Sequence, residues 1–254
     1  MKALILAAGY ATRLYPLTLE RPKALLPVAG KPILEYTLDK IAECPGIEAI
    51  YLVTNRKFYG LFQDWLTGYL ASPSAKASAP IEILDDGTGS NEDRLGSIGD
   101  LRFAIRARGL RDDLLVICSD KIFEFSLKSL VDFFAERREA VNTCFEAGEV
   151  ERIRDRHGCA VADPRGRIVE FQEKPAQPRS TLESVAFYIF PEAAIPLFDL
   201  YLQEGNNPDA PGYFAQWYVQ RRPMYAYLFK EACYDVGTQE AYAEVDRLYA
   251  QKRR

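Results

Sequence analysis

Histidine is almost absent from this chain of 254 residues, which contains only His157. A Ser-His-Asp or Cys-His catalytic group would have to depend on that one residue. His157 stands in the polar segment RDRHG, residues 154–158, where we expect an exposed loop side chain. The sequence therefore disfavours histidine-based catalysis, and any metal is expected to be a hard cation held by carboxylates.

Cysteines and long apolar runs are also scarce. The five cysteines are scattered, odd in number and without a CxxC pair, which argues against a zinc site and favours reduced thiols in a cytoplasm. No apolar run approaches the ~18 residues of a membrane-spanning helix, and the apolar stretch of residues 3–8 is too short for a signal peptide. We therefore expect a cytoplasmic protein without membrane association.

The charges of the chain are nearly balanced. Its 32 basic and 36 acidic residues give a net charge of −4, so a binder that relies on bulk positive charge to hold nucleic acid is not expected. A chain of this length buries roughly 70% of its extended surface on folding. With 48% hydrophobic residues, it needs neither disulfides nor a structural metal to form a core.

Strand-like and helix-like segments alternate in the first half of the chain. Buried strands are predicted at 2–8, 47–54, 81–84 and 114–118, and helices at 33–42 and 58–70. This alternation predicts a parallel sheet covered by helices, in which ligands bind beyond the carboxyl ends of the strands. Strands and turns dominate after about residue 140, and a last helix is expected from Gln239 to the basic tail at Arg254.

Two loops after the first strand carry the strongest chemical signal. The segment LAAGYATRL, residues 6–14, has small residues that let backbone N–H groups approach a phosphate, and Arg13 supplies a permanently charged donor fork. It matches neither GxxxxGK[ST] nor GxGxxG. In RPKALLPVAGKP, residues 21–32, prolines stiffen the chain around Lys23. Taken singly, the two segments also fit an ordinary glycine turn and a proline-rich surface crossover.

Together these segments resemble the signature of the sugar-1-phosphate nucleotidyltransferases, which join a nucleoside triphosphate to a sugar phosphate and release pyrophosphate. Four later motifs are similar to this family's base-binding glycine loop, metal-binding strand end, sugar-phosphate motif and distal Asp-x-Gly motif. In order, they are LGSIG at 95–99, Ser119-Asp120, FQEKP at 171–175 and YDVGT at 234–238. The chain looks most like the glucose-1-phosphate thymidylyltransferases within that family.

The resemblance implies a fold and an activity. The expected fold is a Rossmann-like three-layer sandwich of α/β class with a mostly parallel central sheet. Residues 1–254 would form one domain, with a nucleotide-binding half at 1–120 and a sugar-phosphate-binding half at 121–254. The expected reaction is Mg²⁺-dependent transfer from a nucleoside triphosphate, dTTP or UTP being favoured, to a sugar-1-phosphate. A homo-oligomer is compatible with the sequence, which leaves the oligomeric state open.

The resemblance also implies roles for individual residues. Arg13 and Lys23 would be catalytic, neutralising the triphosphate, and Asp120 and Asp235 would hold Mg²⁺. A sugar-1-phosphate is already an anionic nucleophile, so the scarcity of histidine is no obstacle. Lys174 would bind the sugar phosphate, while Glu173 and Gly158 line the sugar pocket. The residues expected to bind the nucleotide are Leu6, Ala8, Gly9, Tyr10, Ala11, Thr12 and Gly96.

Three departures from the family pattern affect this assignment. Ser119 and Lys121 flank Asp120 where Gly and often Asn are usual, and Ala186 stands where a glycine is common. The added methyl of Ala186 would crowd a sugar, and Lys121 would compete with Mg²⁺ or contact phosphate.

The sequence leaves open purely structural roles for these residues and other functions for the chain. Asp120 also fits a helix cap, Asp235 a turn residue, and Glu173-Lys174 a surface ion pair. Two other functions remain besides formation of a nucleotide sugar. One is a cytidylyltransferase acting on a non-sugar phosphate such as phosphocholine, and the other is a catalytically silent regulatory module.

Overall fold

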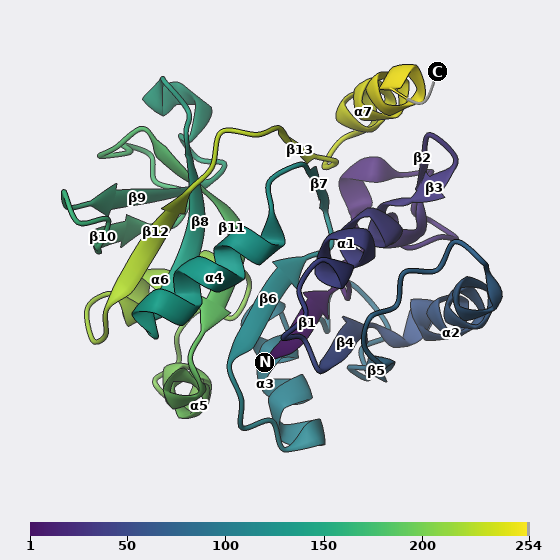
Figure 1. Cartoon of the computed structure of the whole chain (residues 1–254), viewed down its shortest axis with the longest axis horizontal. Coiled ribbons are helices and arrows are strands. Elements are labelled where there is room, and N and C mark those ends of the chain that lie inside the picture. Colours follow the sequence, from purple (N-terminus) through teal and green to yellow (C-terminus); the bar gives the residue numbers. More distant parts are fainter. Residues whose placement is uncertain (253–254) are drawn as a thin grey trace. The chain divides into compact units, whose positions relative to one another are not determined.

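The structure is a computed structural model that describes residues 1–252, and its elements form two compact units (Figure 1). The first unit contains residues 3–94 and 118–128 and the chain from Glu231 onward, and the second contains residues 1–2, 95–117 and 129–230. Each unit therefore includes segments from both predicted halves of the chain. The assignment of one substrate to 1–120 and the other to 121–254 stays a prediction.

Parallel strands and two helices form the main layer of the first unit. Strand β4 (Ala49–Thr54) pairs in parallel with β5 (Ile81–Asp85), and β1 (Lys2–Leu6) neighbours β4 in the sheet. Helix α1 (Ile33–Ala42) buries its apolar face, and α2 (Arg56–Ala71) packs on β5. The alternation of strands and helices predicted for this part of the chain is confirmed.

Two small sheets complete the first unit. Strand β2 (Pro27–Val28) pairs with β3 (Lys31–Pro32), and β7 (Lys121–Phe123) pairs antiparallel with β13 (Cys233–Asp235). Helix α7 (Gln239–Lys252) packs against β2 and β13. The helix predicted from Gln239 to the tail is thus present as far as Lys252, and Arg253 and Arg254 lie outside the described residues.

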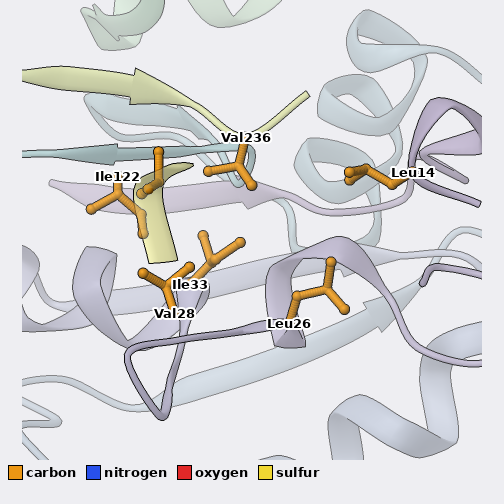
Figure 2. Packing of buried hydrophobic residues seen from close by; sticks show 7 residues of the cluster. Leu14, Leu26, Val28, Ile33, Ile122 and Val236 are labelled. Atoms are coloured by element: carbon orange, nitrogen blue, oxygen red, sulfur yellow. The ribbon is translucent and has the colours of Figure 1, made fainter. Parts of the chain in front are cut away.

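A buried apolar cluster holds these distant segments of the first unit together (Figure 2). In the close-up, Ile122 of β7 lies beside Val28 and Ile33, and Val236 directly follows β13. The cluster consists of Leu14, Leu26, Val28, Ile33, Ile122, Val236 and Val245. Burial of these side chains fixes the ends of β7 and β13 against the loops that precede α1, because interiors are packed too densely to let them shift.

The second unit is built around the long strand β11 (Leu182–Phe190). It pairs antiparallel with β6 (Leu114–Cys118), β8 (Ala140–Glu146) and β9 (Gly158–Ala162), so the whole arrangement contains both parallel and antiparallel pairs. Strand β10 (Ile168–Gln172) pairs with β9, and β12 (Met224–Leu228) runs parallel to β8. The other elements are α3 (Ser97–Arg108), α4 (Leu127–Arg137), η3 (Val150–Arg152), η4 (Glu192–Ala194), α5 (Ile195–Gln203) and α6 (Pro211–Tyr218).

Stacked aromatic rings anchor α6 in the second unit. Phe214 of α6 stacks on Phe198 of α5 with ring centroids 4.2 Å apart, and it meets Phe190 of β11 edge to face at 5.4 Å. All three rings are buried. Aromatic pairs in such geometries are worth about 0.5–1.5 kcal/mol beyond their buried area, so the position of α6 on the sheet is well defined.

The expectation for His157 is wrong in one respect. The residue lies in a bend, as expected, but its side chain is only 29% exposed and its Nδ1 lies 3.5 Å from Glu183 Oε1. The strand β9 that begins at Gly158 draws the preceding residue toward β11.

Among the helices of residues 1–252, none combines the length and apolar character needed to cross a membrane.

Candidate functional site

The loop after β1 is tied to the beginning of α2. The Ala7 amide donates to Val53 O at 2.8 Å, and the Asn55 side-chain amide donates to Ala8 O at 2.8 Å. The same Asn55 side chain caps α2 by accepting from the Phe58 amide at 3.1 Å. Asn55 was not among the residues expected from the sequence, although an Asn directly before an amphipathic run is a recognised helix-start signal.

The loop presents backbone and charge rather than apolar side chains. Leu6, Ala8 and Tyr10 are buried, so only their backbone groups can face a ligand, whereas Gly9 is exposed. A Cβ added to Gly9 would meet nothing within 4 Å, so the space above this residue is open. Burial raises the pKa of Tyr10 above its usual value, and this phenol therefore stays neutral.

The left-handed backbone of Ala11 directs the next residues outward. Its φ is 47°, and it precedes the short helix η1 (Thr12–Leu14), in which Thr12 and Arg13 are exposed and Leu14 is buried. Thr18 Oγ1 donates to Ala11 O at 2.9 Å and holds this turn. A left-handed L-residue costs roughly 1–2 kcal/mol, so packing of Leu14 and the Thr18 hydrogen bond must maintain the conformation.

Lys23 stands between the two aspartates that were predicted to bind a metal. It begins the short helix η2 (Lys23–Leu25), and its Nζ lies 3.8 Å from Asp120 Oδ2 and 3.9 Å from Asp235 Oδ1. The side chain is 12% exposed. The structure therefore brings Lys23, Asp120 and Asp235 together, although the two aspartates are more than a hundred positions apart.

A second lysine completes this cluster. Lys121 of β7 is the register partner of Asp235 in β13, and its Nζ donates to Asp235 Oδ2 at 2.7 Å. The backbone amide of Val236 donates to Asp120 O at 3.0 Å, and that of Ser119 donates to Leu6 O at 3.1 Å. The turn that carries Asp120 is thus bonded both to the end of β1 and to the segment after β13.

The ionisation of the cluster follows from these distances. Burial by itself would raise the pKa of Asp120, but the ammonium groups of Lys121 and Lys23 outweigh it and lower that pKa below its usual value. Conversely, Asp120 and Asp235 raise the pKa of Lys121 despite its burial. Asp120 and Lys121 are therefore both charged near neutral pH.

Gly237 leaves space for the Asp235 carboxylate, and Arg13 lies close to the same position. A Cβ at Gly237 would lie 2.7 Å from Asp235 Oδ1 and 3.6 Å from Arg13 Nη2, too close for the first of these atoms. The Asp-x-Gly motif thus has a steric basis. Arg13, Lys23 and Lys121 carry three positive charges against two negative ones on Asp120 and Asp235, which favours an anionic ligand.

The cluster offers two carboxylates to a cation. Asp120 Oδ1 is buried and has no hydrogen-bond partner among the described residues, which fits an oxygen that awaits a ligand. In contrast, one carboxylate oxygen of Asp235 accepts a hydrogen bond from Lys121. No group of three or more His, Cys, Asp or Glu residues suited to a metal occurs within residues 1–252, so most ligands of a cation here would come from substrate or water.

Glu173 and Lys174 form a separate group in the second unit. The Glu173 side chain is 8% exposed, and Lys174 Nζ lies 4.0 Å from its Oε1. Gln216 of α6 accepts from the Glu173 backbone amide at 3.0 Å. Burial raises the pKa of Glu173 to about 7, although Lys174 acts against this shift. Lys174 has a left-handed φ of 46°, a local strain of the kind that accumulates at ligand sites.

Two glycines make room for the Glu173 carboxylate. A Cβ at Gly212, in the first turn of α6, would stand 1.8 Å from Glu173 Oε2, and one at Gly158 would stand 3.2 Å from it and 2.8 Å from Phe171 Cζ. Gly158 was identified from the sequence, whereas Gly212 was not. The Pro211-Gly212 pair at a helix start gives no local sign that a distant carboxylate occupies the space above Gly212.

Gly96 has a clear packing role. It precedes α3 with a φ of 76°, and a Cβ there would lie 2.6 Å from Pro208 O. Pro208 O also accepts from the Ile98 amide at 2.9 Å. The absence of a side chain at Gly96 therefore lets the segment around Pro208 cover the start of α3, and contact with a base stays a prediction.

Ala186 interrupts the ladder of β11. Its φ is 59°, and the register between β11 and β8 shifts between Ser184 and Tyr188. An irregularity of this kind re-aims side chains and is commonly built with glycine. The alanine noted from the sequence as a departure therefore occupies a position that favours glycine.

Comparison with known proteins agrees with this arrangement. A family model described as "Nucleotidyl transferase" matches residues 2–252. The chain is 30% identical over 195 residues to a UTP–glucose-1-phosphate uridylyltransferase of Haloferax volcanii, covering 76% of this chain and 73% of that protein. It is also 30% identical over 226 residues to the mannose-1-phosphate guanylyltransferase regulatory subunit alpha of Homo sapiens, covering 84% of this chain and 50% of that protein.

The fold has solved counterparts as well. A UDP-glucose pyrophosphorylase solved with UDP-glucose has a TM-score of 0.81 at 22% identity, with 99% of both chains covered. This likeness confirms the Rossmann-like α/β fold, a mixed sheet with mostly parallel strands flanked by helices. The chain spans about half the length of several curated relatives that it matches.

Proposed function

Because the chain belongs to the nucleotidyl transferase family, we propose that it transfers a nucleotidyl group from a nucleoside triphosphate to a sugar-1-phosphate, releasing pyrophosphate. The observation that carries the proposal is the grouping of Arg13, Lys23 and Lys121 around Asp120 and Asp235. dTTP or UTP is the favoured nucleotide, from the motifs of the sequence. Named relatives include a uridylyltransferase and a protein named as a putative mannose-1-phosphate guanyltransferase, so the assay must include GTP.

The proposed transfer needs charge neutralisation more than acid–base chemistry. An oxygen of the sugar phosphate attacks the α-phosphorus, and the bond from the α-phosphorus to the bridging oxygen breaks, so that the electron pair leaves with pyrophosphate. No proton has to be removed from the nucleophile. Arg13 and Lys23 would hold the triphosphate in place, and preorganised cations of this kind stabilise the charge that develops on the leaving group.

Mg²⁺ is proposed as the cofactor. Asp120 and Asp235 would hold it, and the unpartnered Asp120 Oδ1 is the oxygen best suited to do so. When bound, the ion would neutralise charge on the α-phosphate. Hard divalent cations of this size are commonly held by one or two carboxylates together with substrate phosphates, which suits a cluster that has only two.

The second unit would bind the sugar-1-phosphate. Lys174 supplies a cation for its phosphate, and the buried Glu173 carboxylate can accept hydrogen bonds from sugar hydroxyls. Gly158 and Gly212 permit this position of the Glu173 carboxylate, because they have no side chain that would occupy its space. Ala186, which stands where a glycine is common in the family, would influence which sugar is accepted. It lies two residues from Ser184 in β11, and a Cβ at Gly158 would lie 3.1 Å from the Ser184 Cβ.

A second candidate is a catalytically silent module that binds a nucleotide sugar. The ion pair between Lys121 and Asp235 favours it, because a carboxylate held by an ammonium at 2.7 Å is less available to a metal. A relative that is named as a regulatory subunit is consistent with it. Retention of Arg13, Lys23, Asp120 and Lys174 favours the enzyme.

A substrate panel tests the proposal. The full chain with Mg²⁺ is incubated with dTTP, UTP, GTP, CTP or ATP and with glucose-, mannose- or N-acetylglucosamine-1-phosphate or phosphocholine, and pyrophosphate release is followed. We expect release with a sugar-1-phosphate and with dTTP or UTP. Release only from CTP with phosphocholine would replace the proposal by a cytidylyltransferase. Binding of a nucleotide sugar without release in any combination would replace it by the silent module.

A further inference from the structure

Lys121 adds positive charge to the proposed site, but the proposed reaction gives it no role of its own. We propose that Lys121 is a resident counter-cation of the Asp120–Asp235 pair, and that it prevents this pair from binding Mg²⁺ until a polyphosphate supplies further negative charge. The inference rests on the proposed function only in taking these two aspartates as oxygen donors. It concerns the protein before any substrate binds.

The position of Lys121 is set by strand pairing. It lies directly opposite Asp235 in the β7–β13 ladder, and the residue after it, Ile122, is buried in the apolar cluster together with Val236 (Figure 2). Because the neighbours on both strands are anchored in this cluster, the backbone cannot carry the ammonium away from Asp235. The Lys121 side chain is itself 9% exposed, whereas Asp235 is 38% exposed, so the ammonium has little water to replace its carboxylate partner.

The charge count explains why the aspartate pair is a weak cation site. Lys23 contributes a second ammonium within 4 Å of both carboxylates. Two ammonium groups cancel the charge of two carboxylates, and Arg13 beside Gly237 adds a further positive charge. A dication that approaches this cluster meets no net negative charge, and the affinity of oxygen sites for hard cations depends on the count of ligand charges.

The free oxygens lead to the same conclusion. Asp235 Oδ2 is engaged by Lys121, and Asp120 Oδ2 and Asp235 Oδ1 each lie within 4 Å of the Lys23 ammonium. The buried oxygen without a hydrogen-bond partner is Asp120 Oδ1. Three of the four carboxylate oxygens thus face an ammonium that Mg²⁺ would have to displace, and this ion dehydrates reluctantly and is usually shared with substrate phosphates. A triphosphate would add several anionic oxygens beside Lys23 and Arg13. The metal is therefore expected to enter with the nucleotide and not before it.

The test measures metal binding without nucleotide or sugar phosphate. Mn²⁺ is titrated into the full chain and the free ion is followed by electron paramagnetic resonance, with Mg²⁺ as competitor. Wild type is expected to bind only in the millimolar range. Lys121→Met, which keeps the length of the side chain without its charge, is expected to bind about tenfold tighter or more. Lys121→Arg, which keeps the charge, is expected to remain as weak as wild type.

A matched control separates local from overall charge. Lys40→Met removes one positive charge from α1, where Lys40 pairs with Glu43 outside the cluster, and it should leave Mn²⁺ affinity unchanged. Equal tightening in Lys40→Met and Lys121→Met would overturn the proposal. Micromolar binding by wild type would do so as well, even if both Lys121→Met and the alternative Lys121→Gln failed to fold by circular dichroism. Since no substrate is present in the Mn²⁺ titration, a negative result in the transferase assay does not change its outcome. A negative result in the titration likewise leaves the proposed transferase activity untouched.

Discussion

The carboxylate of Glu173 fills the space where a side chain of Gly212 would stand. Glu173 directly follows β10, whereas Gly212 lies in α6, and a Cβ on Gly212 would lie 1.8 Å from Glu173 Oε2. Because Gln216 on the same helix holds the Glu173 amide, α6 sets both the backbone and the carboxylate of this residue. Gly212 thus acts on the proposed sugar site through Glu173.

Gly212→Ala is expected to displace the Glu173 carboxylate without unfolding the protein. Loss of one hydrogen-bonding carboxylate from the sugar site should raise KM for the sugar-1-phosphate by roughly tenfold, about 1.4 kcal/mol, while KM for the nucleotide stays unchanged. Steady-state kinetics of pyrophosphate release measure both constants. Gly68→Ala in α2 is the control, since a Cβ there meets nothing within 4 Å. Equal kinetics for the two variants would exclude Gly212 from positioning Glu173.

The buried Glu173 should make stability depend on pH. Its pKa is raised to about 7 in the folded protein, chiefly by burial, so between pH 4.5 and pH 7 the folded state binds the proton more tightly than the unfolded state does. Protonated Glu173 therefore contributes to the free energy of unfolding. This contribution is fully present below the pKa that Glu173 has in the unfolded chain, and it is lost as the pH rises through 7. It amounts to about 3 kcal/mol, by order of magnitude.

Urea denaturation of wild type and Glu173→Gln at pH 5 and pH 8 measures this dependence. The free energy of unfolding of wild type, relative to Glu173→Gln, should fall between the two pH values. The comparison with the Gln variant removes contributions from other groups, including Asp120, whose lowered pKa acts in the opposite direction at low pH. An identical pH dependence in the two proteins would mean that Glu173 ionises as an exposed carboxyl does.

Ala186→Gly is expected to stabilise the protein. The φ of 59° is unfavourable for alanine and accessible to glycine, so the substitution should add about 1 kcal/mol to the free energy of unfolding. Ala226→Gly in the regular strand β12 should instead lower it by about 0.5–1 kcal/mol. Thermal or urea unfolding measures both changes. Destabilisation by Ala186→Gly to the same degree as by Ala226→Gly would show that the left-handed backbone carries no strain.

Lys23→Ala is expected to slow the proposed reaction severely. Removing a preorganised cation that faces the triphosphate should cost about 2–4 kcal/mol of transition-state stabilisation, by analogy with the loss of one oxyanion donor. kcat/KM for the nucleotide would fall about 30- to 1,000-fold. Lys76→Ala, in an exposed loop of the same unit, removes a charge elsewhere and should leave the kinetics unchanged. Unaltered turnover of Lys23→Ala would place this lysine outside the active site.

Local patterns were sufficient to identify the main strands and helices of residues 1–85, strand β6 and the last helix, but not α3, α4, α5 or α6. The apolar run from Lys2 and the amphipathic stretch from Ile33 correspond to β1 and α1, because burial imposes a period on the chain that the sequence displays. The motifs around Arg13 and Asp235 were also visible. Strand ends were less well placed, since the predicted first strand reached Ala8 but β1 ends at Leu6, where the backbone turns toward Asn55.

The contacts that control the chemistry join residues far apart in the chain. Lys121 and Asp235 are 114 positions apart, Asn55 and Ala8 are 47 apart, and Glu173 and Gln216 are 43 apart. No local pattern encodes the register of β7 against β13 or the placement of α6 over Glu173, because these follow from how buried faces pack. The sequence thus identifies which charged groups are available, and packing of the folded chain determines which of them neutralise one another.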